Sequence, residues 1–349
     1  MARTHAPKKQ PLEIVSSPRR VLVTGGAGFV GSHLAERLLA GGDHVTILDD
    51  LSTGSLENVA QLIADPRFTL VVDDVTDQSA VETLVADSDL VVHLAAAVGV
   101  KLILTNPLGS IETNVAGTRN VLEAAARDGT KVLIASTSEV YGKVSRTPQR
   151  EDDDVVLGPT CFTRWSYAAA KMLDEFLALS YRTLMAVPVV VFRLFNTVGP
   201  RQSAAYGMVI PRFVEAAVRG EPLPVYGDGE QLRCFLHVAD AVEAIVRLAD
   251  CPEAVGEVVN VGSVEQVAIR ELADRVLAHV GAGAIEYVPY EQAYPEGGFE
   301  DIRCRFPEIS KIRALTGWEP TRSLNDILAD VVAQYAYPVV PALAPAQLL

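Results

Sequence analysis

The stretch TGGAGFVG, residues 24–31, directly follows the apolar run RRVLV and decides how the rest of the sequence is interpreted. Gly25, Gly28 and Gly31 stand between a predicted strand and a predicted amphipathic helix. At such a turn, glycine lets the backbone approach a pyrophosphate closely, and the free N–H groups of the helix N-terminus point at it. The spacing therefore predicts a dinucleotide cradle made of Gly25, Gly28, Phe29, Val30 and Gly31.

Two aspartates close the next predicted strand, HVTILDD, and Asp49 lies eighteen residues beyond Gly31. Asp49 is placed to accept hydrogen bonds from an adenosine ribose, and Asp50 would repel a 2′-phosphate. The sequence therefore predicts that the cofactor is NAD rather than NADP. The ends of the third and fourth predicted strands add further expected cofactor contacts at Asp74, Val75, Leu94, Ala95 and Ala96.

Short β-branched runs alternate with helical patterns along most of the chain. This alternation is typical of an α/β protein with a doubly wound parallel sheet, a Rossmann fold, and the nearly all-apolar strands agree with helices on both faces. After NTVGPRQ, loops rich in Gly and Pro indicate a smaller α/β substrate-binding lobe. The expected division is a tail at 1–18, an NAD-binding domain at 19–196 and about 234–263, a nucleotide-sugar lobe at 197–233 and 264–337, and a tail at 338–349.

Composition and charge exclude several classes of function. Of 349 residues, 49% are hydrophobic and 21% charged, which is the balance of a soluble globular enzyme. The net charge of −14 predicts repulsion from nucleic acid and from anionic membranes. The sequence contains no run of about 18 apolar residues, so it predicts no membrane-spanning helix. The four cysteines form no Cys-x-x-Cys pair and the six histidines have no metal-ligand spacing. We expect reduced thiols, no metal site and a cytoplasmic location.

The predicted chemistry lies in STSEVYG, at the end of the fifth strand, and in WSYAAAK, which follows it. Tyr167 and Lys171 are four residues apart and share one face of a helix. A nearby ammonium and a nicotinamide cation both favour the phenolate and lower the pKa of the tyrosine. Tyr167 is thus the expected general base, taking a proton from a carbinol while hydride leaves the carbon.

These motifs, in this order, resemble those of the extended short-chain dehydrogenases/reductases that act on nucleotide sugars, the NAD-dependent epimerase/dehydratase group. The resemblance runs from about residue 20 to about residue 337 and also includes HLAA, TNVAGT, RLFNTVGPR, GEPLPVYGDGEQLRCFLHVAD and FEDIRCRFPEISKIRALTGWEP. It implies that Thr137 binds the sugar hydroxyl beside Tyr167 and that Lys171 also holds the nicotinamide ribose. It further implies a homodimer through the helices near 107–127 and 166–183, and a nucleotide-sugar substrate, most simply a UDP-sugar. The implied substrate contacts are Ser138, Glu139, Asn196, Arg201, Arg233 and Arg305.

A few positions bear on which reaction of this group is expected. The 4,6-dehydratases carry an aspartate after the catalytic threonine, where this chain has Ser138, so dehydration is disfavoured. C4 epimerisation of UDP-glucose or UDP-glucuronate is the reaction we expect, because RLFNTVGPRQ and YGMVIPRF resemble bacterial 4-epimerases. Glu139 resembles the glutamate of UDP-glucuronate decarboxylases, so decarboxylation is the alternative, together with epimerisation of an unusual nucleotide sugar. A non-catalytic NAD-sensing protein is a further alternative, but Thr137, Tyr167 and Lys171 are all present.

Overall fold

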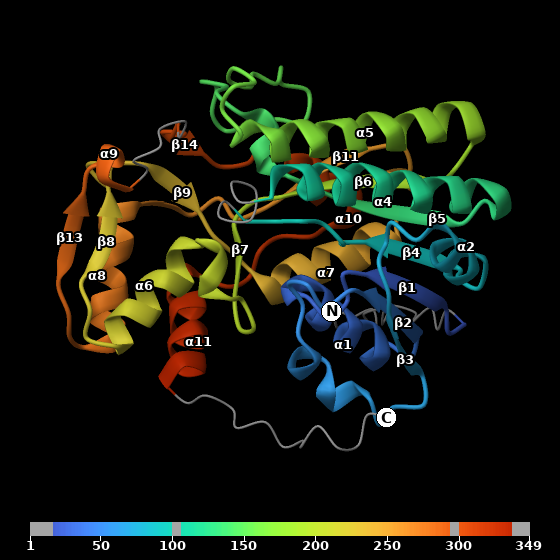
Figure 1. Cartoon of the computed structure of the whole chain (residues 1–349), viewed down its shortest axis with the longest axis horizontal. Helices are drawn as coiled ribbons and strands as arrows, with labels where there is room; N and C mark the ends of the chain where they lie inside the picture. The colour runs from blue at the N-terminus through green and yellow to red at the C-terminus, as the bar shows by residue number, and fades with distance from the viewer. Residues whose placement is uncertain (1–16, 100–105, 294–299, 337–349) are drawn as a thin grey trace, which may run out of the picture.

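The computed structural model describes residues 17–99, 106–293 and 300–336, and its centre is a seven-stranded parallel sheet (Figure 1). The strand order is β11-β6-β5-β4-β1-β2-β3. This confirms the predicted doubly wound parallel sheet. The strands are β1 (Arg20–Thr24), β2 (His44–Asp49), β3 (Phe68–Val72), β4 (Leu90–His93), β5 (Lys131–Thr137), β6 (Val189–Leu194) and β11 (Val258–Val261).

Helices cover both faces of this sheet and bury two separate hydrophobic clusters against it. On one face, Leu34 and Leu38 of the first helix pack with Ile245 of a later one. On the other face, Val121 and Val85 pack against strand residues such as Val132. The first face carries α1 (Phe29–Ala40), α7 (Val238–Ala249) and α10 (Ser310–Thr316); the second carries α2 (Gln78–Ala86), α4 (Pro107–Asp128) and α5 (Trp165–Met185).

The chain changes direction across the sheet between β1 and β4. It builds β1, β2 and β3 outward to one side, then returns to place β4 on the other side of β1, where Thr24 pairs with His93. Crevices at such a switch point, beyond the carboxyl ends of the strands, are where open α/β sheets bind ligands. The glycine stretch after β1 and the HLAA stretch after β4 meet at this crevice.

A smaller lobe lies beside the carboxyl ends of the strands (Figure 1). Its core joins Phe213, Leu272 and Leu328 from three helices. Those helices are α6 (Val209–Val218), α8 (Ile269–Val280) and α11 (Leu324–Ala336).

The remaining strands and helices of the described chain are β7 (Thr197–Val198), β8 (Leu223–Tyr226), β9 (Leu232–Cys234), β10 (Leu236–His237), β12 (Gln266–Ala268), β13 (Ile285–Val288), α9 (Tyr290–Ala293) and β14 (Cys304–Arg305). The 3₁₀ helices are η1 (Leu56–Asn58), η2 (Ala60–Leu62), η3 (Ser138–Tyr141), η4 (Ala204–Tyr206) and η5 (Pro252–Ala254).

One helix lies differently from the expected division of the chain. The expected smaller lobe includes 264–337, but α10 contacts α7 and β11 on the large sheet. The physical reason is apolar packing, because Ile312 and Trp318 are buried in the same cluster as Val259 of β11. The polypeptide therefore crosses between the two lobes more often than the sequence pattern indicates.

Candidate active site

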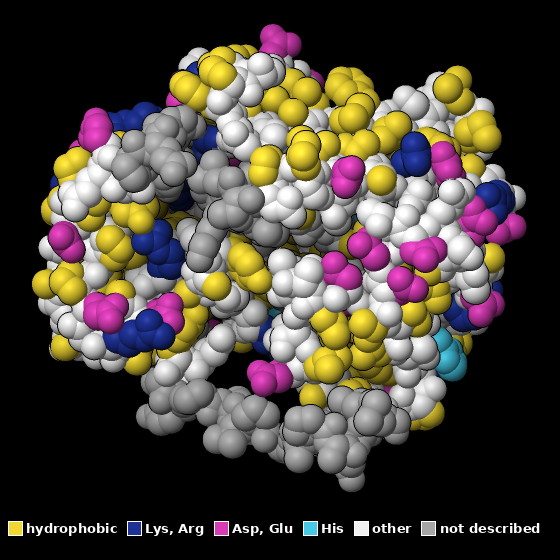
Figure 2. Space-filling model, in the orientation of Figure 1, with side chains coloured by type: hydrophobic (Ala, Val, Ile, Leu, Met, Phe, Trp, Pro, Cys, Tyr) yellow, Lys and Arg dark blue, Asp and Glu magenta, His cyan; other side chains and the backbone are white. Residues whose placement is uncertain are grey.

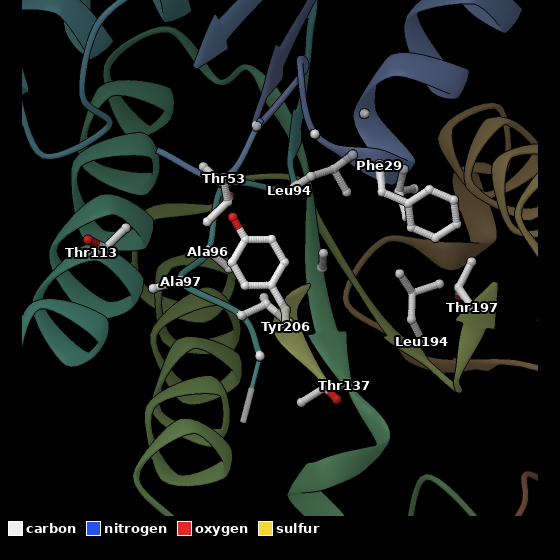
Figure 3. Close-up of a pocket in the computed structure, with 18 of the residues that line it drawn as sticks. Phe29, Thr53, Leu94, Ala96, Ala97, Thr113, Thr137, Leu194, Thr197 and Tyr206 are labelled. Atoms are coloured by element: carbon white, nitrogen blue, oxygen red, sulfur yellow. The ribbon is translucent and has the colours of Figure 1, made fainter. Parts of the chain in front are cut away.

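A pocket of about 440 Å³ opens at the switch point of the sheet. Phe29 of α1, Thr137 of β5 and Tyr206 of η4 border it from three distant parts of the chain (Figure 3). Most of the site residues expected from the sequence line it together: Gly25, Gly28, Phe29, Val30, Gly31, Asp49, Asp50, Asp74, Val75, Leu94, Ala95, Ala96, Thr137, Ser138, Glu139, Tyr167, Asn196, Arg201 and Arg305. Lys171 and Arg233 lie behind this wall rather than in it.

The glycine stretch is packed too closely to carry side chains. A Cβ on Gly31 would lie 2.1 Å from the carbonyl oxygen of Gly25. Gly25 has φ +70°, a left-handed conformation that favours glycine, and donates its N–H to Leu48 O at 2.8 Å. Gly28 is the N-cap residue of α1 and has no side chain to cap it. The N–H groups at the start of α1 therefore face the pocket, as an anion site requires.

The two aspartates at the end of β2 differ in environment. Asp49 is 7% exposed, and its carboxylate accepts the N–H groups of Ala27 and Leu51, each at 2.9 Å. Burial raises the pKa of Asp49, while these hydrogen bonds oppose the rise. Asp50 is exposed and accepts hydrogen bonds from the Ser52 backbone and hydroxyl. Asp49 thus ties the glycine turn to β2 and still borders the pocket.

Several lining residues were missed by the sequence reasoning. Thr53 and Asn58 lie in the segment between β2 and the end of η1, so their closeness to Asp49 in the chain was a usable signal. Thr113 lies in the TNVAGT stretch but carries no chemical pattern of its own. Tyr206 comes from a 3₁₀ helix of the smaller lobe, and only the tertiary structure brings it to the pocket.

The residues expected to do chemistry converge at the end of β5. Thr137 ends this strand, and its hydroxyl accepts the N–H of Glu139 and is hydrogen-bonded to Tyr167. Tyr167 lies in the first turn of α5. Burial, followed by the charges of Glu139 and Asp174, raises the pKa of the Tyr167 phenol, while the Thr137 hydrogen bond lowers it. Ionisation of Tyr167 therefore requires added positive charge in the pocket.

Lys171 follows one turn later on α5 and is almost fully buried. Its ammonium lies 2.8 Å from the carboxylate of Asp174, which the sequence reasoning did not single out. Residues four apart on a helix share a face, so Lys171 lies beneath Tyr167.

Glu139 occupies the centre of a group of arginines. Its carboxylate forms ion pairs with Arg305 and, at 3.5 Å, with Arg164. Although burial acts against ionisation, these arginines lower the pKa of Glu139 to about 2. Arg305 also donates to Asn196 Oδ1 at 2.7 Å, which places both expected substrate contacts on the same wall.

The other two arginines expected at the substrate lie elsewhere. Arg233 forms an ion pair with Asp301 at 2.8 Å, behind the pocket wall, and burial and Arg305 lower its pKa. Arg201 donates to Ser32 at 3.2 Å and to Glu36 at 2.7 Å, so it lies against the start of α1. That position is on the side of the glycine turn rather than beside Glu139. Within the described parts of the chain, no group of three or more His, Cys, Asp or Glu side chains is arranged to hold a metal ion.

A protein-family model described as GDP-mannose 4,6 dehydratase matches residues 22–331. The chain belongs to this family of extended short-chain dehydrogenases/reductases. The described helices of this family member include none that is both long and apolar enough to cross a bilayer.

Relatives of this dehydrogenase/reductase include decarboxylases and epimerases. It is 43% identical over 317 residues to the UDP-N-acetyl-alpha-D-glucosaminuronate decarboxylase of Bacillus cytotoxicus, covering 90% of this chain and 97% of that protein. It is 39% identical to UDP-glucuronic acid decarboxylase 2 of Arabidopsis thaliana, over 94% of this chain and 70% of that protein. Among solved structures, UDP-glucuronic acid 4-epimerase from Bacillus cereus, in complex with UDP-glucuronic acid and NAD, matches with a TM-score of 0.81 and 28% identity, covering 91% of this chain and all of that one.

Proposed function

We propose that this protein is an NAD-dependent decarboxylase of a UDP-uronate. The two candidate substrates are UDP-glucuronate and UDP-N-acetylglucosaminuronate. The observation that carries the proposal is Glu139, an ionised carboxylate in the same pocket as Thr137 and Tyr167. The decarboxylase relatives support it. The reaction therefore differs from the C4 epimerisation expected from the sequence and corresponds to its alternative.

NAD is the cofactor, as the glycine turn, Asp49 and the NAD-bound solved relatives support. When bound, it accepts hydride from C4 of the sugar. We propose that Tyr167 takes the C4 hydroxyl proton, that Thr137 orients this hydroxyl and that Lys171 holds the nicotinamide ribose. The substrate diphosphate is assigned to Arg305 and Asn196, with Arg233 behind them.

The placement of charge accounts for loss of carbon dioxide. Oxidation at C4 turns the C5 carboxylate into a β-keto acid, and breaking the C5–C6 bond moves its electron pair toward the C4 oxygen. The hydroxyls of Tyr167 and Thr137 stabilise the charge that develops there. Glu139 carries a negative charge. We place it near the C5 carboxylate of the substrate, so that it disfavours the state in which negative charge stays on that carboxylate. This arrangement promotes decarboxylation, whereas an epimerase has to restrain it.

The products of two substrates test this assignment. UDP-glucuronate and UDP-N-acetylglucosaminuronate, each labelled with ¹³C at C6, are incubated with the protein and followed by NMR. We expect labelled carbon dioxide and a pentose nucleotide or its 4-keto form from at least one of them. A product that keeps all six carbons and has an inverted C4 centre would instead establish the epimerase. Glu139→Gln is the matched variant, and we expect it to slow release of carbon dioxide at least tenfold.

We also propose that the protein forms a homodimer through α4 and α5. These two helices contact each other and carry a patch of exposed apolar side chains, here called the α4/α5 patch, which is seen at the top of the molecule in Figure 2. A symmetric pair of such helices would cover the patch on both copies. The α4/α5 patch includes Leu108, Ile111, Leu173, Phe176 and Leu184.

Substitution in the α4/α5 patch is expected to change the oligomeric state. Phe176 is 61% exposed, so Phe176→Glu places a charge in the proposed interface without disturbing the core. We expect light scattering to give a dimer for the unmodified protein and a monomer for Phe176→Glu. Tyr287→Glu, on the smaller lobe and 54% exposed, is the control and should remain dimeric. A monomeric unmodified protein would refute the interface.

A further inference from the structure

An ion pair is buried directly behind the proposed base. Lys171 and Asp174 lie three residues apart on α5, with Nζ 2.8 Å from Oδ2 and side-chain exposures of 2% and 0%. Removing both charges from water is costly, so such a pair is weak support for stability alone. Its position one turn beyond Tyr167 points instead to a role at the site.

The neighbouring carboxylates of Glu175 and Glu139 form ion pairs with arginines rather than with Lys171. Glu175, the next residue of α5, forms an ion pair with Arg193 of β6 at 2.7 Å. From η3, Glu139 is paired with Arg305. Lys171 and Asp174 are therefore left to compensate each other.

A series of polar side chains lies on the other side of Asp174. The Thr118 hydroxyl of α4 opposes the rise in the pKa of Asp174, and His93 Nε2 lies 3.1 Å from that hydroxyl. His93 Nδ1 lies 2.8 Å from the Thr24 hydroxyl, which in turn accepts the N–H of Ala95 at 3.2 Å.

The protonation state of His93 sets the direction of hydrogen-bond donation in this series of side chains. Burial lowers the pKa of His93 to about 3, so the ring is neutral and has one donor and one acceptor. If Thr118 donates to Asp174, it accepts from His93 Nε2–H, and Nδ1 then accepts from Thr24. In that orientation the Thr118 hydroxyl donates toward Asp174, which opposes the rise in pKa that burial causes in this carboxyl group.

We propose that Asp174 is a positioning residue for the cofactor: its carboxylate holds the Lys171 ammonium and offsets the charge of that ammonium beside the nicotinamide. This inference rests on the proposed function in one respect, namely that Lys171 holds the nicotinamide ribose. The oxidised nicotinamide ring is a cation and the reduced ring is neutral. An uncompensated ammonium nearby opposes binding of the oxidised form more than that of the reduced form. Asp174 therefore removes an electrostatic penalty on binding of NAD⁺, the form in which each reaction cycle begins.

Titration calorimetry with NAD⁺ and NADH tests this without any sugar substrate. In Asp174→Asn, which preserves the shape of the side chain, we expect the ratio Kd(NAD⁺)/Kd(NADH) to rise about tenfold, because an ammonium left uncompensated beside the ring acts on the charged, oxidised form alone. Asp174→Glu retains the charge and should restore the ratio to within about threefold of the unmodified protein. Asp153→Asn removes another buried carboxylate, paired with Arg146 away from the pocket, and should leave the ratio unchanged.

The ratio separates an electrostatic role from a structural one. If Asp174→Asn weakens both forms equally, the residue only braces α5 and the proposal is wrong; an unchanged or lowered ratio also overturns it. Should Asp174→Asn fail to fold, Asp174→Ser removes the same charge and leaves room for water, and the same rise is expected. Absence of turnover with UDP-uronates would refute the proposed function but would not affect this measurement.

Discussion

Tyr167→Phe is expected to reduce kcat by roughly 10²-fold or more, the range for loss of a general base, with little change in the affinity for the nucleotide. The reason is that the phenol hydroxyl is the group assigned to take the C4 proton, and Thr137 hydrogen-bonds to it. Binding of the nucleotide is assigned instead to the arginines around Glu139. Turnover of the labelled UDP-uronate and calorimetry with UDP give the two quantities.

A matched substitution guards against a general effect of losing a hydroxyl. Tyr287 lies in β13 and is 54% exposed, so Tyr287→Phe should retain the activity of the unmodified protein. A Tyr167→Phe variant within a few-fold of the unmodified protein would exclude Tyr167 as the base.

Gly31→Ala is expected to destabilise the protein and remove cofactor binding together. Its Cβ would lie 2.1 Å from Gly25 O and 2.7 Å from the Cα of Gly26, so α1 would have to move away from β1. Overpacking of this kind costs roughly 1–3 kcal/mol of folding free energy. We expect a Tm lower by several degrees and no measurable binding of NAD by calorimetry.

Gly28→Ala separates the two effects. Among the described residues, a Cβ on Gly28 would approach Gly25 O at 3.1 Å, a tight contact but a much longer one than at Gly31, so the Tm should fall less. The same Cβ stands at the N-terminus of α1, where the pyrophosphate approaches, so NAD affinity should still fall. Equal losses of Tm in both variants would contradict the packing argument.

Features encoded locally were predictable from the sequence, and features created by tertiary packing were not. The glycine turn and the Tyr167–Lys171 pair depend on residues a few positions apart, so their spacing carried the signal. The position of Arg201 depends on how the chain returns to α1 after β7, which no local pattern reports. Nothing in the local sequence distinguishes Asp174 from an exposed charge on a helix, because its burial comes from α4 packing on α5.

The reaction itself was harder to predict than the fold. Epimerases and decarboxylases share the same oxidation at C4, so the Thr137, Tyr167 and Lys171 set does not distinguish them. We assign the difference to how the C5 substituent is held, and candidate side chains such as Glu139 and Arg164 meet only in the folded protein.

The way the chain moves between the lobes limits how new specificities can arise. The cofactor side of the pocket is encoded by one nearly continuous stretch, from β1 to β6. The smaller lobe is assembled from separate segments, interrupted by α7, β11 and α10, all of which pack on the large sheet. Recombination at one breakpoint after β6 can therefore exchange most of the large sheet between relatives, although α7, β11 and α10 remain with the second segment, whereas transplanting the smaller lobe requires several coordinated crossovers. We expect substrate range in such proteins to change mainly by point substitution within the pocket wall.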